Sequence, residues 1–104
     1  MTHTTEPISR LRQRLIEDMR LRKLSPKTQT QYIRWVKDLA EFLEHSPHTA
    51  TAEDLRRFQL HLVETGIGSP SLNMAVTALR FFFTVTLGRA EVMAQMSHVY
   101  EPRK

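Results

Sequence analysis

The sequence lacks cysteine, contains only three glycines and has no long hydrophobic run. The lack of cysteine excludes a disulfide scaffold and any zinc or iron–sulfur site with cysteine ligands. No apolar run approaches the roughly 20 residues that cross a bilayer, and the first six residues lack the apolar stretch of a signal peptide. We therefore expect a cytoplasmic protein without a membrane partner. Neither GxGxxG nor GxxxxGK occurs, which argues against a glycine-rich phosphate loop.

The length of 104 residues and the mixed composition predict one small domain with a single core. The net charge of +4 is unevenly distributed. Residues 1–37 contain nine Lys or Arg and three Asp or Glu, residues 38–68 two and six, and residues 69–104 four and two. Two positive regions thus flank an acidic middle. This segregation is typical of polyanion-binding proteins, although ordinary solvated helix faces also produce it.

Apolar side chains recur at three- and four-residue steps through most of the chain, which predicts helices. No segment alternates with period two for long enough to be a convincing strand, so the predicted fold class is all-α. We predict helices over about 7–23, 26–45, 70–87 and 90–97, and one that opens at Thr51 and stops at Gly66.

Capping residues mark the predicted helix starts. Ser25 and Ser69 are each followed by proline, which suits the first helical position, so both serines are predicted N-caps. Thr51 and Asp54 predict a capping box in which Asp replaces the usual Glu. Gly66 is predicted to close the third helix in the left-handed conformation.

The sequence shows no arrangement of catalytic or metal-binding residues. His45 and His48 are separated by Pro47, so they do not share a regular helical face, and no nearby carboxylate has ligand spacing. There is no Gly-x-Ser-x-Gly elbow, and Tyr32 lies on an apolar helix face, where we expect it in the core. We expect no catalytic residue, no metal and no cofactor in this chain.

Small polar and basic residues gather in the first turns of the second and fourth predicted helices. Helix N-termini offer free N–H groups and a positive dipole end to phosphates, while Gln, Asn and Arg can reach base edges. The alternative is that the serines only cap the helices and the others form a solvated face. The residues concerned are Ser25, Lys27, Thr28, Gln31 and Arg34, and Ser69, Ser71, Asn73, Thr77 and Arg80.

The order of several short motifs resembles the N-terminal core-binding domain of tyrosine recombinases of the phage-integrase type, with integron and transposon integrases especially similar. The resemblance covers roughly residues 8–104. It rests on Leu24-Ser25-Pro26-Lys27-Thr28 followed by Tyr32, Leu39 and Phe42, on Ala52-Glu53-Asp54-Leu55, and on Ser71-x-Asn73 followed by Leu79-Arg80-Phe81-Phe82-Phe83.

This resemblance implies a SAM-like bundle of four or five helices that forms half of a clamp on double-stranded DNA at the recombination core site. The implied DNA contacts are Lys27, Thr28, Gln31, Arg34, Ser71, Asn73, Thr77 and Arg80. The chain would be one domain, ordered over about 7–98, with 99–104 starting the linker to a catalytic domain that this chain lacks. It would therefore bind DNA without cutting or joining it. Implied partners are that catalytic domain and other protomers of a synaptic complex, at the bacterial nucleoid.

A helical protein-interaction module is the alternative, because such bundles need not bind DNA. The fourth predicted helix carries a second apolar stripe, Met74, Phe81 and Val85, and the last one carries Met93 and Met96. These side chains could form a partner surface, pack between protomers or complete the core. The sequence leaves these possibilities open.

Overall fold

The computed structural model describes residues 7–96, which are almost entirely helical. The α-helices are α1 (Pro7–Leu21), α2 (Pro26–Leu43), α3 (Ala52–Glu64) and α4 (Ser69–Phe81). The short segment η1 (Pro47–Thr49) lies between α2 and α3, and η2 (Phe82–Thr86) and η3 (Ala90–Gln95) follow α4. Within this range, no helix is long and apolar enough to span a membrane. The predicted linker at 99–104 lies outside the described residues.

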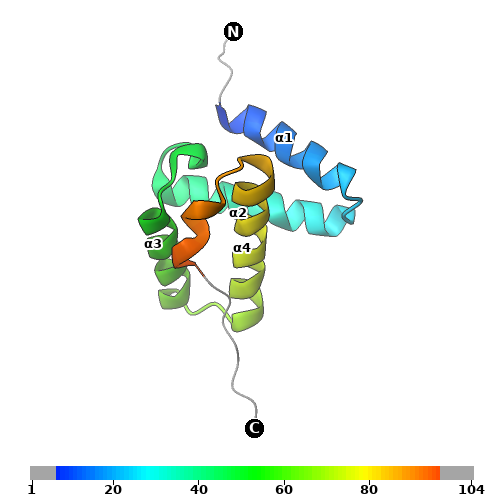
Figure 1. Ribbon diagram of the computed structural model, residues 1–104. Helices are drawn as coiled ribbons and strands as arrows, with labels where there is room; N and C mark the ends of the chain where they lie inside the picture. Colours follow the sequence, from blue (N-terminus) through cyan, green and yellow to red (C-terminus); the bar gives the residue numbers. More distant parts are fainter. Residues whose placement is uncertain (1–6, 97–104) are drawn as a thin grey trace.

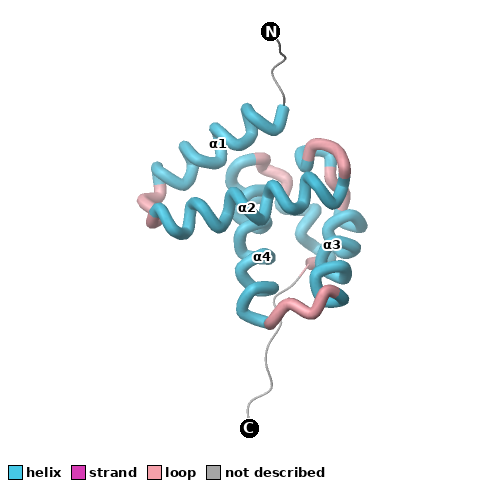
Figure 2. Tube along the Cα trace, turned by 180° about the vertical axis from the view of Figure 1, so that it is seen from behind, coloured by secondary structure: helices cyan, strands magenta, loops and turns pink. Residues whose placement is uncertain are grey.

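The helices form an orthogonal bundle around one core. In Figure 1, α3 and α4 stand side by side and α2 runs across them behind. Figure 2 shows the same crossing from the other side, with α1 running next to α2. Buried side chains from all four helices and from η2 and η3 belong to one hydrophobic cluster. The predicted all-α, SAM-like bundle is confirmed.

Two of the predicted helix starts are confirmed in their hydrogen bonds. The backbone N–H of Thr28 donates to Ser25 Oγ at 3.2 Å, so Ser25 caps α2. In the capping box of α3, the N–H of Asp54 donates to Thr51 Oγ1 at 3.1 Å, and the N–H of Thr51 donates to Asp54 Oδ2 at 3.0 Å. Each bond satisfies a donor that the first turn of a helix leaves unpaired.

The predicted cap Ser69 is wrong. Gly68 is the N-cap of α4, and its carbonyl accepts the first helical hydrogen bond from the N–H of Leu72 at 3.0 Å. Ser69 is therefore the first helical residue, and Pro70 occupies the second position. Proline fits there equally well, since the N–H groups of the whole first turn lack helical partners.

Both α1 and α2 end two residues before the predicted position. Lys23 and Glu44 adopt left-handed conformations with φ of 59° and 63°. A left-handed residue ends a helix by turning the chain away from its axis, and glycine usually occupies that position. No glycine marks these two ends in the sequence, so their boundaries could only be approximate.

Replacing Glu44 by glycine should stabilise the protein by up to about 1 kcal/mol, because the left-handed conformation is costly for a residue with a Cβ. The matched control is Glu41→Gly in the same helix, which should destabilise by about 1 kcal/mol, since glycine disfavours a helix interior. Urea unfolding followed by circular dichroism measures both variants. Equal destabilisation by the two substitutions would contradict a left-handed helix end.

Most of the second apolar stripe of α4 completes the core. The ring of Phe81 lies 5.6 Å from that of Tyr32 between centroids, and Tyr32 is buried as predicted. Met93 and Met96 are also buried, and Met74 is half-buried against the cluster. These residues therefore pack within the described bundle, which leaves little of the predicted stripe for a partner.

The predicted helix over 70–87 changes its winding at Phe82. The segment η2 is π-helical and buries Phe82, Phe83 and Thr86. The hydroxyl of Thr86 donates to Asp18 Oδ2 at 2.8 Å, and its carbonyl accepts from Arg14 Nη2 at 2.9 Å. These two bonds join α1 to the end of α4. The last helical segment, η3, is a 3₁₀-helix.

Candidate nucleic-acid interface

An open groove of about 720 Å³ lies between α2 and the N-terminal half of α4. Residues four and then three positions apart on α2 share one helix face, so Lys27, Gln31 and Arg34 all line the same wall. Ser71, in the first turn of α4, lines the opposite wall. The crossing of the two helices thus brings cationic, amide and hydroxyl side chains to one concave surface.

Four of the eight predicted contact residues meet in this groove, and four do not. Thr28 is half-buried in the first turn of α2, where its Oγ1 accepts a hydrogen bond from the Ser25 hydroxyl at 3.0 Å. These hydrogen bonds with Ser25 stabilise the start of α2, and this structural role is enough to explain why a threonine occupies position 28.

The other three, Asn73, Thr77 and Arg80, follow one another along α4 on a polar strip outside the groove. Asn73 and Thr77 are half-buried, whereas Arg80 is exposed. Their spacing of four and three residues places them on one helix face. The predicted site is therefore divided into a groove and a neighbouring strip, and the role of each in DNA binding stays a prediction.

The apolar floor of the groove was missed as a part of the site. Trp35, Ile67 and Met74 line it, together with Thr30 and Pro70. Trp35 recurs at helical spacing with the apolar residues of α2, but its side chain is only half-buried. Its position four residues after Gln31 was the signal that it borders the polar wall, because such residues are neighbours on a helix.

The cations of the groove are not neutralised by carboxylates of the described chain. Within residues 7–96 the ion pairs are Arg56–Glu53 at 2.8 Å and Arg89–Glu91 at 3.4 Å, both away from the groove. The hydrogen bond from Arg56 lowers the pKa of Glu53. Lys27 and Arg34 are exposed and keep their charges available to an anion.

The described residues show no cluster of metal ligands. They contain no group of three or more His, Asp or Glu side chains that could hold a metal ion. His45 Nδ1 lies 2.9 Å from the carbonyl of Ser46, and His48 Nδ1 lies 2.7 Å from the Ser46 hydroxyl, so both rings take part in loop hydrogen bonds. Burial raises the pKa of the Tyr32 hydroxyl, which disfavours the tyrosinate.

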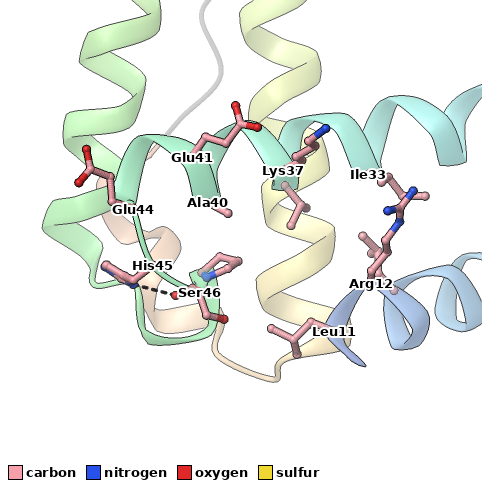
Figure 3. Close-up of a pocket in the computed structure, with 12 residues that line it drawn as sticks. Leu11, Arg12, Ile33, Lys37, Ala40, Glu41, Glu44, His45 and Ser46 are labelled. Atoms are coloured by element: carbon pink, nitrogen blue, oxygen red, sulfur yellow. Dashed lines mark hydrogen bonds between the residues drawn. The ribbon is translucent and has the colours of Figure 1, made fainter. Parts of the chain in front are cut away.

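A second, apolar hollow of about 440 Å³ lies between α1 and α2 (Figure 3). Leu11 and Leu15 of α1 face Ile33, Val36 and Ala40 of α2 across it, and Pro47 also lines it. None of the predicted contact residues lines this hollow.

Comparison with known proteins places the chain in a family. Residues 11–91 match the phage integrase N-terminal SAM-like domain. The chain is 40% identical over 97 residues to y4qK of Sinorhizobium fredii, which is named as a candidate integrase/recombinase. That match covers 90% of this chain and 32% of the relative, so the chain spans about a third of that protein's length. No solved structure matches the chain significantly. The chain therefore belongs to the phage integrase family, of which it contains the N-terminal SAM-like domain.

Proposed function

We propose that this domain binds double-stranded DNA at the core site of a site-specific recombination reaction, as one half of a clamp. The observation that carries the proposal is the groove between α2 and α4, where Lys27, Gln31, Arg34 and Ser71 meet. The groove combines two cations that no carboxylate of residues 7–96 neutralises with short hydrogen-bonding groups and the first turn of a helix. This is the set of groups that phosphate and base edges require.

The proposed contacts fall into two groups, those to phosphates and those to base edges. Lys27 and Arg34 neutralise phosphates, and the Ser71 hydroxyl adds a short hydrogen bond to the backbone. Gln31 carries both a donor and an acceptor, so it can read a base edge in the major groove. Asn73 and Arg80, on the neighbouring strip of α4, have the same capacity. Trp35 and Met74 add apolar side chains to the lining of the groove.

Catalysis is proposed to belong to a different domain of the full-length protein. The proposed single domain covers residues 1–104, with 99–104 leading into a linker. The family's catalytic arginine, histidine and tyrosine pattern has no counterpart in this chain, and Tyr32 is buried in the core. The chain by itself then grips DNA but neither cuts nor joins it. Other protomers in a synaptic complex would supply the second DNA partner.

The 104-residue chain is expected to bind duplex DNA with a Kd of roughly 10⁻⁴–10⁻⁶ M at physiological salt, the range of sequence-independent binding. A domain that forms only half of the clamp does not encircle the DNA, so a higher affinity is not expected. NMR titration with a duplex locates the surface, and the shifts should centre on the groove-lining residues of α2 and α4. Shifts confined to α3, or none at millimolar duplex in low salt, would contradict the proposal.

A protein-interaction module is the second candidate, and the apolar hollow between α1 and α2 is the observation that favours it. Its floor of leucine, isoleucine and valine side chains suits an apolar side chain of a partner rather than a phosphate. Salt dependence separates the two candidates. Phosphate binding weakens steeply as salt rises, whereas an apolar contact does not.

A further inference from the structure

We propose that Arg22, at the end of α1, is a further phosphate-binding residue of this domain, held in position by the ring of Phe81. The inference rests on the proposed DNA-binding function and deepens it. Arg22 was not among the residues predicted to contact DNA. It extends the proposed interface beyond the groove to a third helix.

Arg22 reaches across from α1 to α4. Its Cζ lies 5.6 Å from the centroid of the Phe81 ring, within the range of a cation–π contact. Phe81 is itself held by Tyr32, with 5.6 Å between ring centroids. Arg22 Nη1 also donates a hydrogen bond to the carbonyl of Asp18 at 3.1 Å, which further restrains the guanidinium.

The place of Phe81 on α4 puts Arg22 on the same side of that helix as the proposed interface. Phe81 follows Met74, which lines the groove, by seven residues, and follows Thr77 of the polar strip by four. Residues at these spacings lie along one side of a helix. The guanidinium over Phe81 therefore stands on the same side of α4 as the groove and close to the strip.

The charge of Arg22 is available to a ligand. The residue is exposed and forms no ion pair within residues 7–96. By contrast, Arg56 is paired with Glu53 and Arg89 with Glu91. A guanidinium has five N–H donors, of which the contact with Asp18 uses one.

A pre-oriented guanidinium suits phosphate binding. Much of the cost of using a long side chain comes from the loss of its rotamer freedom. Stacking on an aromatic ring limits that freedom without neutralising the charge, and the planar fork matches two phosphate oxygens. Lysine would keep the charge but lose both the stacking and the fork.

The test compares Arg22→Ala, Arg22→Lys and the matched control Arg20→Ala in duplex binding by the 104-residue chain at several salt concentrations. Arg20 is an exposed arginine in the last turn of α1, two residues before Arg22. Arg22→Ala should weaken binding about threefold to tenfold and lower the salt slope by about one. Arg22→Lys should keep the slope and recover only part of the affinity. Arg20→Ala should change binding by less than about twofold.

A second variant tests the role of the ring. Phe81→Leu leaves the net charge unchanged but removes the stacking surface, so it should weaken binding by less than Arg22→Ala does and keep the salt slope. The double variant should bind no more weakly than Arg22→Ala alone. Equal losses for Arg20→Ala and Arg22→Ala would show an effect of overall charge and overturn the role of Arg22. If the unchanged chain shows no salt-sensitive DNA binding, the proposed function itself fails, and the assignment of Arg22 with it.

Discussion

Reversing the charges of Lys27 and Arg34 to glutamate should reduce DNA affinity by at least about 100-fold, because two proposed phosphate contacts become repulsive. Both side chains line the same wall of the groove, and neither is paired with a carboxylate in the described chain. The unchanged chain is expected to bind DNA only with sequence-independent affinity. A further 100-fold loss should therefore leave no measurable binding at physiological salt. Fluorescence anisotropy of a labelled duplex, titrated at three salt concentrations, gives both the affinity and the salt slope.

The matched control reverses Arg10 and Arg57, two exposed arginines of α1 and α3 that lie outside the groove. The net charge changes equally in the two double variants, so a difference between them reports position and not total charge. Unfolding in urea should be within about 0.5 kcal/mol of the unchanged chain for both, since the four positions are exposed. Equal loss of DNA binding in the two variants would contradict a localised interface.

Truncation of Phe82 to alanine should destabilise the domain by about 3–5 kcal/mol, the usual range for a fully buried phenylalanine. Its side chain has no exposed surface, and its ring lies 5.1 Å from that of Phe83 in an edge-to-face arrangement. A domain of this size has a total stability of about 5–15 kcal/mol. The loss should therefore lower the Tm by more than about 12 °C.

Thermal and urea unfolding followed by circular dichroism measure the effect of Phe82→Ala. The control is Leu60→Ala on α3, where the side chain is 46% exposed and truncation should cost less than about 1 kcal/mol. Phe82 sits where α4 changes to the π-helical segment, so the variant also tests the packing of that turn. A loss below about 1 kcal/mol would mean that Phe82 is not a core residue.

Local chemistry explains which predictions from the sequence held. Capping depends on residues three apart, so Ser25 with Thr28 and Thr51 with Asp54 could be identified without knowledge of the fold. The apolar periodicity likewise identified all four α-helices and placed Tyr32 in the core. Ser69 failed because the residue before it, Gly68, offers an extended backbone and a carbonyl that begin the helix one position earlier.

Tertiary contacts decided the winding at the end of α4. A regular α-helix through Thr86 was the simplest expectation from the periodicity. The structure instead inserts a π-helical segment, which buries two adjacent phenylalanines and brings the Thr86 hydroxyl to Asp18. Asp18 lies 68 residues away in the sequence, so this hydrogen bond leaves no local signal.

The sequence by itself determined the fold class, the order of the helices and the residue types that could bind DNA, because these depend on spacing within one helix. Only the tertiary structure decided which of those residues meet. The crossing of α2 and α4 joins Lys27, Gln31 and Arg34 to Ser71 in one groove and leaves Arg80 outside it. The same packing carries Arg22 from α1 onto Phe81. Contacts between separate helices depend on how their apolar faces fit together, and the pattern along any one helix does not contain that information.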